Sequence, residues 1–228
     1  MKALIAPMRK IHLTPLKLLV HTIAIFLIGW LLYDYFSGNL TVNPIQAATQ
    51  RSGRYAIAFL TLSLAATPAN TFFRFRQALT VRRMLGLYAF LFASLHVLLF
   101  VGVDYRFDLP TLADEVLFKP YILVGLSTML ILIPLAVTSF RWWMKRLGRS
   151  WTRLHRLVYL AGVLVVIHYT WAVKGDLTSL QGEIGMPLFY ALAVTLLLIA
   201  RLPPVRRTAS GLHTRYRLRK NHPAQAES

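Results

Sequence analysis

The chain has 228 residues, of which 56% are hydrophobic, and it carries a net charge of +18 and no cysteine. That apolar share is far above the usual share of a soluble domain, and it indicates an integral membrane protein with little mass outside the bilayer. The lack of cysteine excludes disulfides, cysteine-ligated zinc, iron–sulfur clusters and covalently attached c-type heme.

Six apolar segments follow one another along the chain, and they predict an all-α bundle of six transmembrane helices. A helix needs about 20 apolar residues to cross the hydrocarbon core of a bilayer. The predicted spans are about 16–36, 54–73, 84–103, 118–140, 151–171 and 186–202. We therefore expect one membrane domain over residues 1–200 and a basic cytoplasmic tail over residues 203–228.

The positions of the charged residues predict the orientation of this bundle. If the N-terminus is cytoplasmic, 21 of the 26 Lys and Arg residues fall in the N-terminal segment, the 69–83 and 141–156 regions and the tail. Seven of the eight Asp and Glu residues fall on the opposite side or at its border. This is the positive-inside pattern, and it predicts that both termini are cytoplasmic. Basic residues near anionic lipid also account for the net charge without a nucleic-acid partner.

Four of the seven histidines lie at predicted membrane depth, namely His21, His96, His155 and His168. An ionisable ring inside a bilayer is costly, so each is a hypothesis of function. His96 and His168 lie on different helices at comparable distances from the cytoplasmic ends. Two such imidazoles can clamp a porphyrin, and we predict that they ligate the iron of a b-type heme. The alternative is that each makes only an interhelical hydrogen bond.

His155 lies near the cytoplasmic end of the Trp151–Trp171 stretch, 13 residues before His168. Thirteen residues correspond to about 20 Å of helical rise and a rotation of roughly 220°, so the two rings do not simply stack on a straight helix. The only other histidine at the depth of His155 is His21. A His21–His155 pair would bind a second, inner heme; the alternative is an interfacial histidine beside basic residues.

Several side chains at the cytoplasmic level of the third and fifth spans have the chemistry to hold a flavin phosphate or a quinone head. They are Arg82, Arg83, Arg149, Trp151 and Arg153. The alternative is that they are positive-inside anchors with an interfacial tryptophan. The sequence has no phosphate loop, zinc motif or nucleophile–base arrangement, which argues against substrate chemistry in this chain.

Four stretches resemble a known family: GRYAIAFLTLSLAATP, RRMLGLYAFLFASLH, KPYILVGLSTMLILIPLAVTS and LGRSWTRLHRLVYLAGVLVVIHYTWAVK. They look like the heme-binding membrane subunit of the bacterial periplasmic methionine sulfoxide reductase system, the MsrQ or YedZ family. More broadly they are similar to the ferric-reductase-type transmembrane domain, and the likeness covers residues 16–201. Larger relatives carry two histidines on each of two helices, whereas Arg82 or Arg83 stands at the inner position here.

The resemblance implies a multi-pass protein of the bacterial inner membrane with one or two b-type hemes and FMN on the cytoplasmic side. It implies electrons from the quinone pool or a cytoplasmic flavin reductase. It also implies a periplasmic molybdopterin-containing partner that reduces methionine sulfoxide in proteins, a lesion that disrupts protein cores. The chain would then be a non-catalytic electron-transfer subunit. Acidic residues in the outer loops would then steer a basic docking face; the alternative is that acidic residues are simply tolerated on that side.

Two other functions stay open at this point. One is a self-contained ferric or quinone reductase. The other is a transporter that uses membrane histidines as proton relays, against which the predicted spans lack acidic residues at depth and show no inverted repeat.

Overall fold

The computed structural model describes residues 14–173, 175–176, 181–182, 184–205 and 207. Nearly all of them are helical, and the predicted class of helical membrane protein is confirmed, because five helices are long and apolar enough to cross a bilayer. The helices are α1 (Pro15–Phe36), α2 (Pro44–Phe73), α3 (Arg76–Leu98), α4 (Leu109–Phe118), α5 (Pro120–Val137), α6 (Arg141–Leu147), α7 (Arg149–Leu154), α8 (Leu157–Ala172) and α9 (Gly185–Ile199). Two short strands, β1 (Gly175–Asp176) and β2 (Gln181–Gly182), pair antiparallel between α8 and α9.

The second helix is longer at its N-terminus than its apolar run predicts. Asn43 caps α2 through its side chain, which accepts a hydrogen bond from the backbone N–H of Gln46 at 3.1 Å. Pro44 takes the first helical position, where its missing N–H costs nothing. The helix thus begins ten residues before the predicted start at residue 54 and runs for 30 residues. Half of the added residues are polar, and Ala48, Thr49 and Ser52 among them are buried, which the apolar run alone does not reveal.

Three other predicted spans also differ in detail from the observed helices. The third continues past α3 through a π-helical segment, η1 (Leu99–Asp104), a feature often found beside functional sites. The fifth is divided into α7 and α8 around His155. The sixth is α9, whose 15 residues give about 22 Å of rise against a hydrocarbon core of about 30 Å.

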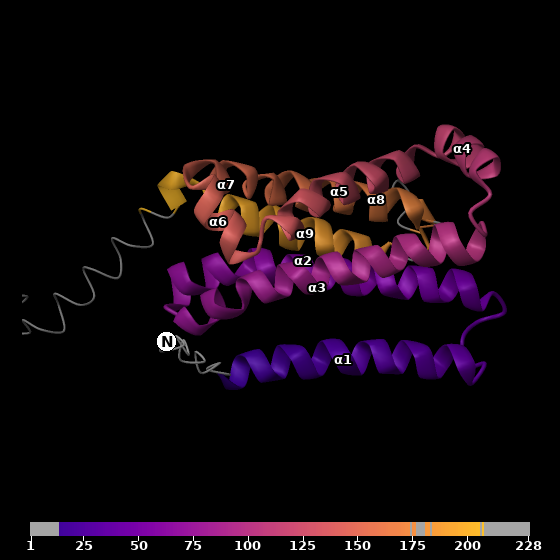
Figure 1. Cartoon of the computed structure of the whole chain (residues 1–228), viewed down its shortest axis with the longest axis horizontal. Helices are drawn as coiled ribbons and strands as arrows, with labels where there is room; N and C mark the ends of the chain where they lie inside the picture. Colours follow the sequence, from indigo (N-terminus) through magenta and orange to yellow (C-terminus); the bar gives the residue numbers. More distant parts are fainter. Residues whose placement is uncertain (1–13, 174, 177–180, 183, 206, 208–228) are drawn as a thin grey trace, which may run out of the picture.

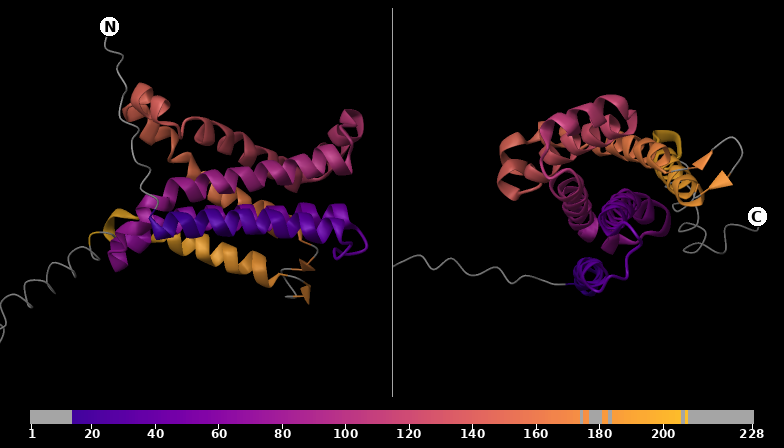
Figure 2. Two further views of the ribbon diagram at one scale, coloured as in Figure 1. Left: turned by 60° about the horizontal axis from the view of Figure 1, so that its bottom comes forward. Right: turned by 90° about the vertical axis from the view of Figure 1, so that its right-hand side faces the viewer.

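Five helices form a closed ring in which each packs against the next: α2, α3, α5, α8 and α9. Helix α1 lies outside this ring and contacts α2 and α3 (Figures 1 and 2). Helix α5 separates α3 from α8 on one side, so α3 and α8 face each other across the interior. The start of α1, the end of α9 and the short helices α6 and α7 lie at one end of the bundle, and α4 lies at the other (Figure 1).

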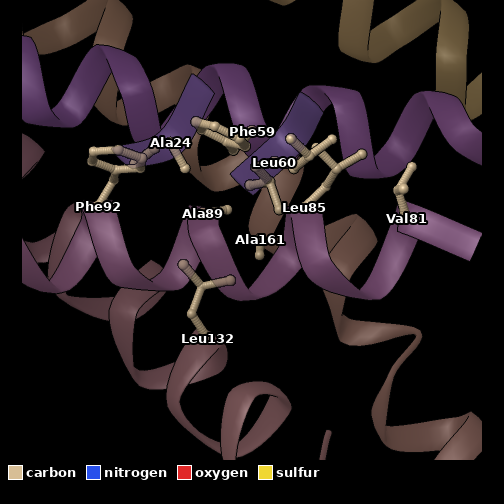
Figure 3. Packing of buried hydrophobic residues seen from close by; sticks show 11 residues of the cluster. Ala24, Phe59, Leu60, Val81, Leu85, Ala89, Phe92, Leu132 and Ala161 are labelled. Atoms are coloured by element: carbon tan, nitrogen blue, oxygen red, sulfur yellow. The ribbon is translucent and has the colours of Figure 1, made fainter. Parts of the chain in front are cut away.

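A buried apolar cluster fills the interior of the bundle (Figure 3). Its members are Val20, Ala24, Ala56, Phe59, Leu60, Val81, Leu85, Ala89, Phe92, Leu132 and Ala161. Small residues let helices approach closely, which is the main source of helix association inside a bilayer. Ala24, Ala89 and Ala161 are at most 1% exposed and serve this role on three helices. Many other large apolar side chains are exposed on the outside of the bundle, as expected for a surface that faces lipid.

One arginine, Arg201, donates the hydrogen bond that a proline in α2 cannot supply. Pro68 lies within α2 and has no N–H, so the carbonyl of Leu64, four residues earlier, has no helical partner. The guanidinium of Arg201, just after α9, donates to this carbonyl at 2.5 Å. It also donates to the Tyr159 hydroxyl at 2.7 Å and lies over that ring. Arg201 therefore ties α9 to α2 and α8.

Replacing Arg201 should destabilise the bundle because the Leu64 carbonyl is then buried without a partner. We expect Arg201→Leu to lower the free energy of unfolding by about 1–3 kcal/mol. Unfolding in mixed detergent micelles, followed by circular dichroism, measures this change. In a Pro68→Ala background the restored N–H can serve the same carbonyl, so Arg201→Leu should cost less there. An equal loss of unfolding free energy in both backgrounds would contradict this role of Arg201.

Candidate cofactor site

Two histidine rings face each other across the interior of the helical ring. His96 comes from α3 and His168 from α8, and their ring centroids are 6.1 Å apart with the planes at 82°. The sequence placed these two side chains at one depth, and the structure brings them together. They lie towards the end of the bundle that carries α4.

Each of these rings is held by one hydrogen bond to a backbone carbonyl of a neighbouring helix. The distance from His96 Nδ1 to the Thr49 carbonyl is 2.7 Å, and that from His168 Nδ1 to the Tyr121 carbonyl is also 2.7 Å. A carbonyl can only accept, so each Nδ1 carries the proton and each Nε2 keeps its lone pair. Neither Nε2 has a hydrogen-bond partner among the described residues. Metal-ligating histidines are held in this way, by the nitrogen that does not bind the metal.

A glycine on the neighbouring helix makes room for each ring. An ideal Cβ at Gly125 would lie 2.8 Å from both Nδ1 and Cε1 of His168. At Gly53 it would lie 3.0 Å from Nδ1 of His96. The distance at Gly125 is too short for any side chain, and at Gly53 the ring would have to move by a few tenths of an ångström, so glycine at both positions lets the imidazoles pack closely on α2 and α5.

The two halves of the site repeat one spacing. Each carbonyl precedes its histidine by 47 residues, and each glycine lies four residues after the carbonyl. The α2–α3 and α5–α8 pairs therefore hold an imidazole in the same way, with an offset of 72 residues, the difference between 96 and 168. Sequence reasoning missed this repeat. The matching Gly53–His96 and Gly125–His168 spacings were the signal that would have revealed it.

The separation of the rings suits one metal atom between them. An imidazole nitrogen lies about 2 Å from a bound metal and about 1.1 Å from its own ring centre, so a metal between two imidazoles sets the ring centres about 6 Å apart. The described part of the chain has no group of three or more His, Cys, Asp or Glu side chains that could hold a metal ion. The pair therefore suits a metal that brings four planar ligands of its own, as in a porphyrin.

His155 lies in a different environment near the opposite end of the bundle. Its ring stacks on Trp151 at 4.1 Å, and its Nε2 lies 3.1 Å from the Thr138 hydroxyl. That hydroxyl donates its one hydrogen to the Pro134 carbonyl at 2.6 Å, so His155 Nε2 must be the donor to it. The indole N–H of Trp151 donates to the Thr138 carbonyl at 2.9 Å. Thr138 thus positions both rings.

The remaining candidate residues divide into two groups. Arg82 and Arg83 act electrostatically on His155, and Arg83 corresponds to His155 at the offset of 72 residues. Arg149 and Arg153 are exposed, and among the described residues neither makes a hydrogen bond or ion pair. His21 does not meet His155; its Nδ1 lies 2.5 Å from the hydroxyl oxygen of Tyr88 on α3.

Comparison with known proteins identifies the family of this chain. The family model described as ferric reductase like transmembrane component matches residues 52–166. Relatives named "Protein-methionine-sulfoxide reductase heme-binding subunit MsrQ" include one from Rhodospirillum rubrum, 44% identical over 80% of this chain and 85% of the relative. Others come from Xanthomonas euvesicatoria (41%, over 71% and 77%) and Caulobacter vibrioides (38%, over 80% and 84%). The chain therefore belongs to the MsrQ family, within the wider group that shares the ferric reductase like transmembrane component.

Proposed function

We propose that this chain is a transmembrane electron-transfer subunit that carries b-type heme and supplies electrons to a reductase of methionine sulfoxide in proteins. The observation that carries the proposal is the pair of facing imidazoles, each held by a carbonyl through Nδ1 and each with a free Nε2. The relatives named as heme-binding subunits support it. Because the chain has no cysteine, covalent attachment is excluded and the heme is b-type.

In this proposal His96 and His168 would hold the iron of the heme through Nε2, and the heme would supply a one-electron redox centre near the outer end of the bundle. The chain orients both rings before the heme binds, which limits the cost of ordering them. Arg54 follows Gly53 and acts electrostatically on Tyr55 and Tyr190. No described carboxylate pairs with Arg54. It is therefore the cation that we assign to the carboxylates of the heme.

The opposite end suits a flat, anionic or hydrogen-bonding head group better than a second heme. His155 is stacked on an indole and hydrogen-bonded to a threonine, and the position that would supply a second ligand is Arg83. We propose that Arg82, Arg83 and Trp151 hold a flavin phosphate or a quinone head there. FMN and the quinone pool or a flavin reductase as donor come from the family resemblance. The inner heme of His21 and His155 stays a prediction. In the structure the two rings have different partners, Tyr88 for His21 and Thr138 for His155.

We propose that electrons cross between these two levels through the packed interior. Arg83 and His96 are 13 residues apart on α3, which corresponds to about 20 Å of rise. The buried cluster extends along α3 from Val81 to Phe92, between the two levels (Figure 3). Its apolar side chains exclude water, so the bundle can carry electrons across a membrane without opening a path for protons.

We propose six crossings of the bacterial inner membrane with both termini in the cytoplasm. The start of α1 and the end of α9 lie at the same end of the bundle, as an even number of crossings requires (Figure 1). Helices α6 and α7 lie at that end and carry basic residues, in line with the positive-inside rule. Helix α9, with 15 residues, is short for a span, and Arg201 anchors its end to α2 and α8.

The proposed partner is a periplasmic molybdopterin-containing catalytic subunit that would dock beside α4. Of the carboxylates there, Asp108 caps α4 and Glu115 pairs with Lys119. The hydrogen bond with Glu115 raises the pKa of the Lys119 ammonium, so this ammonium stays charged at neutral pH. Asp104 and Asp114 remain exposed, and they would steer a basic surface of the partner.

If His96 and His168 are the ligands, each of them is essential for heme binding. We expect His96→Ala and His168→Ala to lose the Soret band of protein expressed with added heme, because one imidazole alone leaves an apolar site with a single ligand. The heme-to-protein ratio measures this. Full heme content in both variants would contradict the assignment of His96 and His168 as ligands. His21→Ala serves as the comparison: a redox titration that keeps its shape in this variant excludes His21 as a ligand.

The close packing of Gly53 and Gly125 against the histidine rings leads to a second prediction. Gly125→Ala should displace the His168 ring and reduce heme content, and Gly53→Ala should do so less, because its Cβ contact with the ring is longer. Gly29→Ala is the matched control, since an added Cβ there meets no atom within 4 Å. The heme-to-protein ratio and the midpoint potential of each variant are the readouts. Equal heme content and equal midpoint potentials in all three variants would show that Gly53 and Gly125 do not position the ligands.

The inner site predicts a kinetic effect without loss of heme. Arg83→Gln removes one charged contact to the donor, worth about 1.5–3 kcal/mol, so heme reduction by a short-chain quinol should slow roughly tenfold or more. Anaerobic stopped-flow absorption follows the reduction. Arg149→Gln, which changes an exposed arginine of the same end, should leave the rate unchanged. A normal rate in Arg83→Gln with both a quinol and a reduced flavin as donor would exclude this site.

A further inference from the structure

A second polar pair at membrane depth joins α1 to α3 and has no role in the proposed electron path. His21 Nδ1 and the Tyr88 hydroxyl oxygen are 2.5 Å apart, and the two rings meet edge to face with centroids 5.6 Å apart. Ionisable side chains in a bilayer are costly and are kept for function more often than for packing. Helix α1 lies outside the ring of helices, so the pair does not touch the facing histidines.

A continuous line of aromatic rings leads from this pair towards the outer histidines. Tyr88 contacts Phe59 at 5.6 Å, Phe59 stacks on Phe92 at 5.3 Å, and Phe92 contacts Tyr55 at 5.4 Å, all measured between ring centroids. Figure 3 shows Phe59 and Phe92 next to each other between α2 and α3. Phe59 and Phe92 are 4% and 1% exposed, so the two central rings of the line are shielded from solvent.

The two ends of this line differ in one chemical respect. A phenol gives up an electron readily only if its proton has a base to go to. At Tyr88 the Nδ1 of His21 lies within hydrogen-bond distance of the hydroxyl, and its lone pair can take the proton. Among the described residues no histidine or carboxylate contacts Tyr55 in this way. An oxidising equivalent that starts at Tyr55 therefore becomes more stable when it reaches Tyr88.

We propose that Tyr88 and His21 form a proton-coupled redox pair that collects oxidising equivalents from Tyr55 through Phe92 and Phe59. The co-reactant is a peroxyl radical, which takes a hydrogen atom from Tyr55 and becomes a hydroperoxide. The Tyr55 phenoxyl then takes one electron from Tyr88 and one proton from the acid form of the solvent buffer, and it is a phenol again. The buffer is left as its conjugate base. Tyr88 becomes a neutral phenoxyl, and its proton moves to His21.

This pair would protect the facing histidines. Tyr55 lies two residues after Gly53, which packs against His96, so a radical that stayed at Tyr55 would be close to a ring that oxidation destroys. Movement of the oxidising equivalent along the line removes it from that ring to a phenoxyl stabilised by a hydrogen bond. The proposal does not depend on the heme, because every group in the line belongs to this chain.

The test uses the purified full-length chain and a water-soluble azo initiator that releases peroxyl radicals in air. Samples frozen during the reaction are examined by electron paramagnetic resonance. We expect a phenoxyl signal with an exchangeable proton on a hydrogen bond to its oxygen, and we expect that signal to be lost in Tyr88→Phe. His21→Gln should remove the exchangeable proton and shorten the lifetime of the signal. Phe59→Leu should delay its appearance.

Tyr33→Phe is the matched control, because Tyr33 is an exposed tyrosine on α1 that makes no contact with the line. Circular dichroism and the absorption spectrum check that each variant is folded. An unchanged signal in Tyr88→Phe would overturn the proposal, as would a wild-type signal that lacks the exchangeable proton. That second result comes from the wild type alone, so it holds even if a variant does not fold. A signal with unchanged timing in Phe59→Leu would overturn the aromatic route.

Discussion

The hydrogen bond from a histidine Nδ1 to a backbone carbonyl is the contact on which the proposed function depends. It selects the tautomer, orients the ring and leaves Nε2 free, and it does so twice with the same spacing. The carbonyls of Thr49 and Tyr121 can accept these bonds because a carbonyl oxygen has two lone pairs, and because Gly53 and Gly125, four residues later, let the imidazoles approach. The long N-terminal extension of α2 therefore has a purpose, since it carries one of the two carbonyls.

The two repeated units are alike at one level of the bundle and different at the other. At the outer level both supply an imidazole, which gives a symmetric pair of ligands. At the inner level one unit supplies His155, stacked on Trp151, and the other supplies Arg83. In the proposed function, the repeated spacing would place a redox centre at one end of the bundle, and the altered pair would leave room for an electron donor at the other end.

Depth along a helix could be predicted from the sequence, and it was enough to pair His96 with His168. The direction in which a side chain points could not, because it depends on how the helices pack. His21 shows the difference: it has the right depth for His155, but α1 lies outside the ring of helices and His21 meets Tyr88. The carbonyls of Thr49 and Tyr121 leave no trace in residue identity, whereas Gly53 and Gly125 do, as a repeated spacing to the histidines.

Ligation of the heme iron by His96 and His168 can be tested directly by magnetic circular dichroism of the oxidised, heme-loaded protein in the near infrared, where the position of the charge-transfer band identifies the ligands of the iron. Our account predicts the band of a low-spin iron with two imidazole ligands, present in wild type and in Arg149→Gln and absent from His96→Ala and His168→Ala. A band that indicates other ligands, or an unchanged band in either histidine variant, would contradict it.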